Sequence, residues 1–141
     1  MSGSTFVDTN VLVYAVDDTE PEKQDIARQM LGSNRYGEFV LSAQILSEFY
    51  VTVTRKLIEP MSEAKAAEVV GWLSLRSRVW IDNELVKSAV QISRSSRISY
   101  WDGLVVAAAA RAGCERLLTE DLNDGQVIGS VCVENPFRDV V

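Results

Sequence analysis

Residues 5–16 read TFVDTNVLVYAV. The first of these residues are β-prone and Val11 to Val16 are apolar, a pattern that predicts a buried strand turning directly into a helix. Asp8, Thr9 and Asn10 lie at that turn. Because a carboxylate within an apolar run is costly to remove from water without a partner, we expect Asp8 to have a functional role.

Strand-like and helix-like segments alternate along the rest of the 141-residue chain. This alternation predicts an α/β fold in which helices cover both faces of a mostly parallel sheet, as one domain over residues 1–141. The predicted strands are 5–8, 39–41, 78–81, 117–118 and 130–133. The predicted helices include 11–16, 63–75 and 100–112, with three others that start after the capping residues Thr19, Ser42 and Asp82.

The composition restricts the chemistry that the chain can perform. The formal net charge is −6 and the chain contains no histidine. The negative charge argues against binding nucleic acid mainly by neutralising phosphates, so metal ions would have to supply positive charge if RNA is the substrate. The lack of histidine excludes serine–histidine triads, cysteine–histidine dyads and histidine metal sites. Acid–base and metal chemistry must therefore use carboxylates, hydroxyls and water.

The sequence also predicts where the protein works. Its longest purely apolar run is 104–110, which is far too short to cross a bilayer. The N-terminus does not have the basic region and apolar stretch of a secretory signal. We therefore expect a cytoplasmic protein without a membrane segment.

Four acidic residues are placed where an α/β fold concentrates its chemistry, beyond the carboxyl ends of parallel strands. Asp8 ends the first predicted strand and Asp121 follows the fourth. Glu48 lies on the helix after the second strand, and Asp102 lies in the first turn of the helix that leads to the fourth. Carboxylates brought together would repel one another unless cations shared them. Hard oxygen donors without histidine or thiolate suit Mg²⁺ or Mn²⁺.

Three of the four acids also have a purely structural interpretation. Asp102 comes three residues after Ser99, which is the spacing of a capping box. Glu48 lies away from the apolar face of its helix, beside Gln44, as solvated side chains do. Asp121 precedes a polar, glycine-containing segment and could simply shape a turn. Taken one at a time, these residues leave the choice open.

Five segments in order resemble the motifs of the PIN-domain nucleases. The residues FVDTNVL (6–12) resemble the opening motif, and ILSEFY (45–50) resembles the segment with the acidic helix residue. YWDGLVVAAA (100–109) is similar to the third motif, LLTEDL (117–122) matches the fourth, and NPF (135–137) resembles a common ending. The resemblance spans almost the whole chain and looks most like a VapC-type toxin of a bacterial toxin–antitoxin pair.

The resemblance implies a three-layer α/β/α PIN fold with four or five strands in the order 3-2-1-4-5, and a metal-dependent endoribonuclease activity. Asp8, Asp102 and Asp121 would be the main ligands of Mg²⁺ or Mn²⁺, with Glu48 as a further ligand or as the holder of a water molecule. The cation would make that water a better nucleophile toward the RNA phosphodiester, leaving 5′-phosphate and 3′-hydroxyl ends.

Other residues are candidates for secondary roles around these acids. Thr9, Asn10 and Thr119 could orient the ligands or contact phosphate. Arg94 and Arg97 precede the Asp102 segment and could steer the RNA backbone, although basic residues at a helix end are also favoured by the helix dipole.

Aromatic residues and partners complete the expectations. Tyr36, Trp72, Trp80 and Tyr100 could stack bases or pack subunits, although aromatic residues near apolar strings more often belong to the core. The resemblance implies a homodimer and a cognate antitoxin whose tail lies across the active-site groove. A basic side chain of that tail would replace the cation among the carboxylates.

Three other functions compete with this interpretation. A haloacid-dehalogenase-type phosphatase has a second Asp two residues after its first, where this chain has Asn10. A receiver domain needs a lysine after a late strand, and here the strand at 117–118 is followed by acids. A non-catalytic PIN scaffold that binds RNA or a protein partner is the third alternative. Because all four acids are present, the sequence does not indicate a PIN domain that has lost its active site. A metal-binding titration would distinguish the nuclease from the non-catalytic scaffold.

Overall fold

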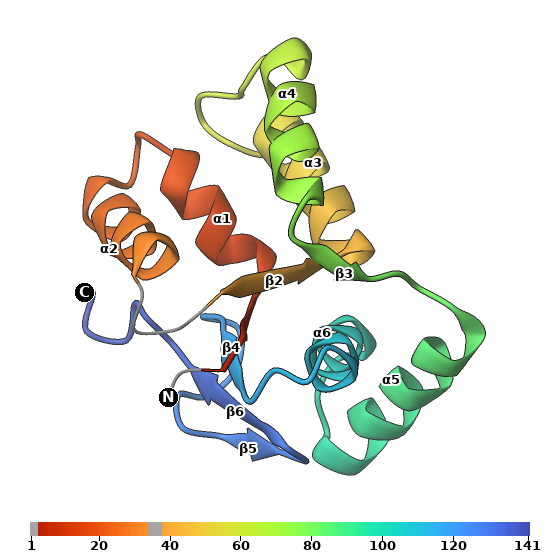
Figure 1. Ribbon diagram of the computed structural model, residues 1–141. Helices are drawn as coiled ribbons and strands as arrows, with labels where there is room; N and C mark the ends of the chain where they lie inside the picture. Colours follow the sequence, from red (N-terminus) through yellow and green to blue (C-terminus); the bar gives the residue numbers. More distant parts are fainter. Residues whose placement is uncertain (1–2, 34–37) are drawn as a thin grey trace.

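The computed structural model describes residues 3–33 and 38–141 and has the α/β fold that the sequence predicts. A six-stranded sheet, in the order β3-β2-β1-β4-β6-β5, has helices on both sides (Figure 1). All neighbouring strands are parallel except β5 and β6. The strands are β1 Thr5–Val7, β2 Phe39–Ser42, β3 Ser77–Val79, β4 Arg116–Leu118, β5 Val127–Ile128 and β6 Val131–Glu134. The helices are α1 Thr9–Val16, α2 Pro21–Gly32, α3 Ala43–Arg55, α4 Glu63–Ser74, α5 Asn83–Ser96 and α6 Tyr100–Arg111.

The predicted order 3-2-1-4-5 holds for the strands found from the sequence, because the predicted fifth strand is β6. The prediction of four or five strands missed β5, which pairs antiparallel with β6 at the edge of the sheet. Its two residues are too few to give a periodic pattern, and Gly129 makes the tight turn to β6 with a φ of 60°. The third strand is Ser77–Val79 rather than 78–81, so Trp80 lies outside the sheet and is exposed.

Side-chain caps fix the starts of five of the described helices, α1 and α3 to α6. The caps of α3, α5 and α6 are Ser42, Asp82 and Ser99, as predicted. The predicted cap at Thr19 is wrong, because α2 begins at Pro21 and its N-cap residue makes no side-chain hydrogen bond. The Thr19 hydroxyl instead donates to Oδ1 of Asp17 at 2.6 Å. Thr19 lies one residue before the N-cap position, which Glu20 occupies, and its hydroxyl stabilises the turn between α1 and α2.

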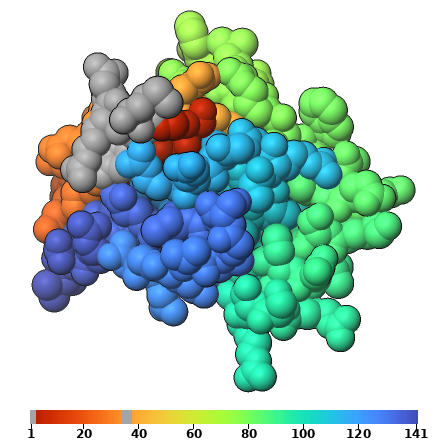
Figure 2. Space-filling model, turned by 60° about the horizontal axis from the view of Figure 1, so that its bottom comes forward, coloured from red at the N-terminus to blue at the C-terminus, as the bar shows by residue number. Residues whose placement is uncertain are grey.

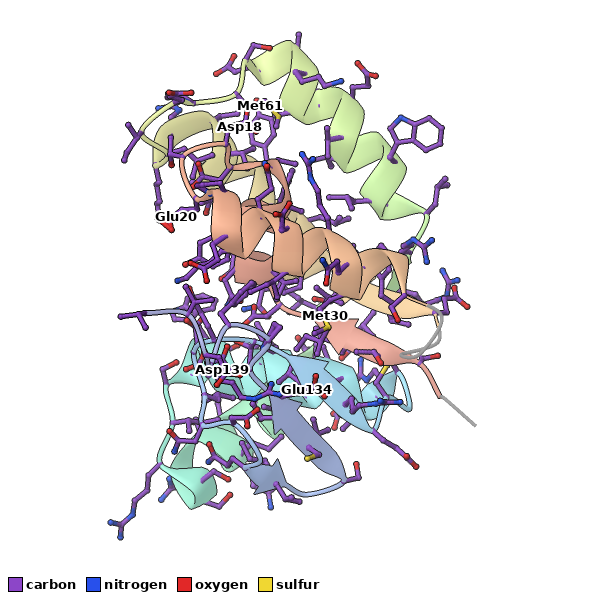
Figure 3. The ribbon with its side chains drawn as sticks, turned by 90° about the vertical axis from the view of Figure 1, so that its left-hand side faces the viewer. Asp18, Glu20, Met30, Met61, Glu134 and Asp139 are labelled. Carbon is purple, nitrogen blue, oxygen red and sulfur yellow. The ribbon has the colours of Figure 1, made fainter. Side chains whose placement is uncertain are left out.

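The helices form two groups on opposite faces of the sheet. One face is covered by α1 to α4, in which α1 packs against α2 and α3, and α3 packs against α4. Figure 3 shows this group from the side, with Met30 of α2 at the boundary between helices and strands. The other face is covered by α5 and α6, and Gly103 lets these two helices approach closely. Within the described ranges, none of the helices is both long and apolar enough to span a membrane.

The sheet brings polar residues of distant segments to one edge. Parallel pairing places the carboxyl ends of β1, β2 and β4 side by side. Residues of β1 and β4 are buried in the core, and the N–H of Asp8 still bonds the carbonyl oxygen of Leu118 at 3.0 Å. The backbone hydrogen bonding between β1 and β4 therefore continues as far as Asp8. The C-terminal segment widens the sheet beyond β4 with β6 and then β5, and it forms much of the surface in Figure 2.

Candidate metal centre

Three carboxylates meet at the carboxyl edge of the sheet. One oxygen each of Asp8, Asp102 and Asp121 lies within 4.8 Å of the others. Asp8 follows β1, Asp121 follows β4, and Asp102 lies in the first turn of α6. The three acids are separated by up to 113 positions in the sequence, since they run from residue 8 to residue 121. The fold therefore gathers a single anionic cluster from three elements.

Asp8 is the buried member of this cluster, with 5% of its surface exposed. Its Oδ1 accepts the backbone N–H of Thr9 at 2.8 Å, and its Oδ2 accepts the hydroxyl of Thr119 at 2.7 Å. Burial raises the pKa of Asp8 to about 7, against the two hydrogen bonds that lower it, and the charges of Asp121 and Glu48 raise it further. Without a bound cation, the buried environment of Asp8 disfavours the charged form of its carboxylate.

The main chain and the side chain of Asp102 lie in different settings. Its backbone N–H donates to the hydroxyl oxygen of Ser99 at 3.0 Å, which caps α6. Its carboxylate nevertheless belongs to the three-acid cluster. The cap uses the main chain and the cluster uses the side chain, so the two interpretations are compatible.

Asp121 is held by two neutral side chains. Asn10 Nδ2 donates to its Oδ2 at 3.3 Å, and its own backbone N–H donates to Oγ1 of Thr119 at 3.1 Å. Desolvation raises the pKa of Asp121, and the nearby charges of Asp102 and Glu120 raise it further. The shift has the same origin as that of Asp8, namely negative charges crowded in a partly desolvated space.

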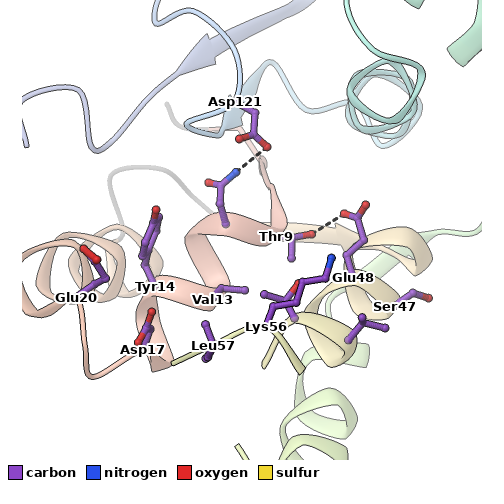
Figure 4. Close-up of a pocket in the computed structure, with 13 residues that line it drawn as sticks. Thr9, Val13, Tyr14, Asp17, Glu20, Ser47, Glu48, Lys56, Leu57 and Asp121 are labelled. Atoms are coloured by element: carbon purple, nitrogen blue, oxygen red, sulfur yellow. Dashed lines mark hydrogen bonds between the residues drawn. The ribbon is translucent and has the colours of Figure 1, made fainter. Parts of the chain in front are cut away.

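Glu48 lies beside the cluster rather than in it. The hydroxyl of Thr9 donates to its Oε1 at 2.9 Å (Figure 4), and Gln44 Nε2 lies 3.4 Å from its Oε2. The three-acid group does not include it. Its charge still acts on the pKa values of Asp8 and Asp121.

The predicted secondary residues Thr9, Asn10 and Thr119 all contact acids. Thr9 joins Asp8 to Glu48, through its N–H and its hydroxyl. Asn10 Nδ2 lies within hydrogen-bond distance of Asp121 and Thr119, and 3.5 Å from Oδ2 of Asp8. Thr119 donates to Asp8 and accepts from the N–H of Asp121. Each of these residues thus contacts at least two other groups of the site.

Gln44 is a residue of the site that sequence reasoning missed. It was expected among solvated side chains, yet only 5% of its surface is exposed. Its Nε2 lies 3.4 Å from Glu48 and 3.3 Å from the carbonyl oxygen of Trp101, so it links α3 to the start of α6. Its Oε1 is buried without a hydrogen-bond partner among the described residues. The helical period of α3 does not reveal this burial, because it depends on a distant contact with Trp101 at the start of α6.

Other predicted residues lie farther out. Arg94 and Arg97 are both exposed at the end of α5, and within residues 3–33 and 38–141 neither forms an ion pair. Trp72 is exposed as well, whereas Tyr100 is half-buried and packs edge-on against Trp101. The remaining aromatic candidate, Tyr36, lies outside the described residues.

A groove of about 660 Å³ lies between α1 and α3, and its lining includes Asp121 and Glu48 but neither Asp8 nor Asp102 (Figure 4). Asp121 and Glu48 lie at one end, and Asp17 and Glu20 contribute further negative charge. Lys56 lies on the α3 side of the same groove. The remaining lining residues are Thr9, Asn10, Val13, Tyr14, Ser47, Val51, Thr52 and Leu57. The groove lining therefore combines four acids and a lysine with several apolar side chains.

The donor set fits a divalent cation. The clustered atoms are carboxylate oxygens, which are the ligands that Mg²⁺ and Mn²⁺ prefer. Burial raises the pKa of Asp8 despite its two hydrogen bonds, and a bound cation would favour the charged form. The residues that would hold the ion are Asp8, Asp102 and Asp121.

Comparison with known proteins identifies the fold family. A family model described as PIN domain matches residues 5–124, which is most of the chain. The chain belongs to the PIN domain family. The resemblance seen in the sequence is therefore confirmed at family level. None of the curated protein sequences matches the chain.

Several solved structures have the same fold as this PIN domain. A chain of a toxin–antitoxin complex from Klebsiella pneumoniae has a TM-score of 0.68 and 18% identity, over 94% of this chain and 97% of that one. For DNA-bound VapBC from Salmonella typhimurium the TM-score is 0.65 and the identity is 18%, over 96% of this chain and 99% of that one. VapC20 of Mycobacterium tuberculosis is a toxin that cleaves the sarcin-ricin loop. Its TM-score is 0.57 and its identity is 18%, over 80% of this chain and 86% of that one. At these identities the likeness shows the fold.

Proposed function

We propose that this PIN domain is a Mg²⁺- or Mn²⁺-dependent endoribonuclease and the toxin of a toxin–antitoxin pair. The observation that carries the proposal is the cluster of Asp8, Asp102 and Asp121, whose oxygens lie within 4.8 Å of one another at the carboxyl edge of the sheet. A nuclease without histidine needs carboxylates and a cation for its chemistry. The cluster supplies the carboxylates.

In this proposal the four acids have two different roles, metal binding and the orientation of water. A bound divalent cation supplies Lewis-acid chemistry, because it acidifies water and withdraws charge from the phosphodiester. Asp8, Asp102 and Asp121 hold it in place. Glu48, fixed by the hydroxyl of Thr9 at 2.9 Å, is placed beside the cluster to orient a water and receive its proton. Attack by water rather than by the 2′-hydroxyl leaves 5′-phosphate and 3′-hydroxyl ends.

The relatives favour RNA as the substrate and an antitoxin as the partner. VapC20, which shares the fold, is a toxin that cleaves the sarcin-ricin loop. The similar chains from Klebsiella pneumoniae and Salmonella typhimurium come from toxin–antitoxin complexes. The groove beside the acids is of a size and polarity that suit a peptide with a basic residue at its anionic end. The homodimer stays a prediction, which exposed apolar residues such as Trp72 and Trp80 support.

Cleavage of labelled RNA by the purified protein tests this function. We expect cleavage in Mg²⁺ or Mn²⁺, none in EDTA, and recovery when the cation is returned in excess. The products should be substrates for a ligase that requires a 5′-phosphate. Cleavage that persists unchanged in EDTA would refute the metal assignment. Binding of RNA without cleavage in either cation would favour the non-catalytic scaffold instead.

A further inference from the structure

Two adjacent acids, Glu120 and Asp121, follow β4, and only one of them faces the cluster. The Asp121 carboxylate joins Asp8 and Asp102. The Glu120 carboxylate is bound elsewhere, by side chains of α1 and α2. The pair itself does not identify the ligand, because both residues carry a carboxylate. Contacts with residues outside the loop must therefore determine which of the two carboxylates faces the cluster.

Lys23 and Tyr14 hold Glu120 on the far side of the loop. Lys23 Nζ lies 3.2 Å from Oε1 of Glu120, and the Tyr14 hydroxyl donates to Oε2 at 2.7 Å. Lys23 also donates to the Tyr14 hydroxyl at 3.1 Å, which closes a three-membered network. The side chains of Lys23 and Glu120 are 23% and 26% exposed, so both are largely removed from water. Each oxygen of Glu120 is therefore occupied.

The network is braced from two directions. Tyr14 packs edge-on against Phe137 of the Asn-Pro-Phe ending, with ring centroids 4.8 Å apart. The Lys23 ammonium lies 4.6 Å from the centroid of the Tyr14 ring, which fixes the cation over the aromatic face. On the other side, the backbone N–H of Glu120 donates to Oδ1 of Asn10 at 3.3 Å. The loop is therefore held by its main chain toward α1 and by this side chain toward α2.

We propose that Lys23, together with Tyr14, is a positioning residue that keeps the Glu120 carboxylate out of the metal centre and leaves Asp121 as the ligand. This inference rests on the proposed cation site. It assigns a role to the partly buried Lys23–Glu120 ion pair. It also explains the packing of the C-terminal Phe137, because that ring supports Tyr14.

Loss of Lys23 has two consequences of opposite sign. Glu120 keeps its charge but loses its cation, so the carboxylate is free to turn toward the cluster. The region also becomes more negative by one charge, which strengthens the binding of a divalent cation. Binding should therefore tighten while the geometry for cleavage is spoiled. A merely structural role for Lys23 would weaken both.

The test uses the full chain with the variants Lys23→Met, Lys23→Arg, Glu120→Ala and the Lys23→Met, Glu120→Ala double variant. The readouts are kcat for RNA cleavage at saturating Mg²⁺, and Mn²⁺ affinity from the electron paramagnetic resonance signal of the free ion. We expect Lys23→Met to lower kcat by roughly tenfold and to bind Mn²⁺ about twofold more tightly or better. Lys23→Arg and Glu120→Ala should stay close to the wild type in kcat. The double variant should recover both values, because the displaced carboxylate is gone and the charge is balanced.

Lys65→Met is the matched control, because Lys65 lies on α4 and pairs with Glu68 in an exposed ion pair. It removes the same charge and should change neither readout. A Lys23→Met variant with wild-type kcat would overturn the proposal, as would a defect that persists in the double variant. Parallel loss of Mn²⁺ affinity and cleavage would also overturn it. If the wild type does not cleave RNA, the proposed function fails, whereas the Mn²⁺ affinities of the single and double variants still test the role of Lys23.

Discussion

The hydroxyl of Thr9 donates a hydrogen bond of 2.9 Å to Oε1 of Glu48, across 39 positions of sequence. Thr9 is the first residue of α1 and directly follows Asp8, while Glu48 lies on α3. The same residue binds Asp8 through its backbone N–H. Thr9 therefore sets the position of the fourth acid relative to the buried member of the cluster.

Removal of this hydroxyl should impair cleavage without unfolding the protein. Thr9→Val keeps the branched shape of a side chain that is 9% exposed and removes its donor. We expect RNA cleavage to fall by roughly tenfold, as is usual when a residue that orients a ligand is lost. Thr9→Ser should retain most of the rate because it keeps the hydroxyl. Full activity of Thr9→Val, with an unchanged melting temperature, would show that Glu48 needs no such support.

Neutralising either of two cluster acids should abolish cleavage. Asp8→Asn and Asp102→Asn keep the size of the side chain and remove one anionic ligand each. We expect cleavage to fall by about 100-fold or more, with circular dichroism spectra like that of the wild type. Cleavage assays at several Mg²⁺ concentrations provide the measurement. Unimpaired cleavage by either variant at all of them would contradict the metal assignment.

The metal-free protein should become less stable as the pH rises toward neutrality. The pKa of Asp8 is about 7 in the folded protein and 3.8 as the ordinary value, so the folded state binds its proton more tightly. The resulting stabilisation is complete below about pH 4 and is lost as the pH rises through 7. The free energy of unfolding should fall by about 1.4 kcal/mol per pH unit between pH 5 and 7. The raised pKa of Asp121 acts in the same direction.

Urea unfolding in EDTA at pH 5.5 and 7.5 measures this effect. In Asp8→Asn the difference between the two pH values should shrink, and at pH 7.5 the variant should be more stable than the wild type. Mg²⁺ should stabilise the wild type most at the higher pH, where the carboxylate is charged. A stability that is independent of pH over this range would mean that Asp8 is charged even without a cation.

Gly103 should be intolerant of a side chain. A Cβ at this position would lie 2.7 Å from the backbone oxygen of Ala89, so Gly103→Ala must push α5 and α6 apart. We expect a loss of about 1–3 kcal/mol in the free energy of unfolding, with weaker cleavage because Asp102 is the preceding residue. Gly71→Ala is the control, since no atom lies within 4 Å of a Cβ there. This helical position should gain up to about 1 kcal/mol, and equal effects of the two changes would contradict the packing argument.

An antitoxin tail should compete with the cation. If a basic side chain of the tail enters the cluster, its binding should weaken as Mg²⁺ is added. Calorimetry with the antitoxin peptide, on the wild type and on the Asp8→Asn, Asp121→Asn double variant, provides the measurement. We expect weaker binding to the double variant. Affinity that ignores both Mg²⁺ and the two charges would place the tail elsewhere, over the RNA path or at the dimer contact.

Much of the fold could be predicted because its signals are local. The apolar run around Asp8 and the capping residue Ser99 specify a strand end and a helix start within a few residues. The alternation of strands and helices then predicts a parallel sheet, whose carboxyl edge is where sites form. The strand β5 was not predicted because two residues beside a glycine turn are too few to show a periodic pattern of apolar residues. The predicted cap at Thr19 was wrong because α2 begins one residue later than a cap at Thr19 requires, with Glu20 at the N-cap position.

The sequence by itself determined which residue types were available for chemistry. Without histidine, and with acids after two strands, a carboxylate site with a divalent cation was the consistent interpretation. It also determined the order of the motifs, which identified the PIN family later matched over residues 5–124. These features depend on composition and spacing, so they need no knowledge of distant contacts.

Only the tertiary structure decided which of these groups meet. It placed Gln44 under α6 rather than in solvent and joined Thr9 to Glu48. It also turned Glu120 toward Lys23 and left Asp121 to face Asp8. Each of these outcomes depends on a contact between residues far apart in the chain. The direction of a side chain there is set by desolvation and pairing with whatever the fold brings beside it, and local sequence does not contain that information.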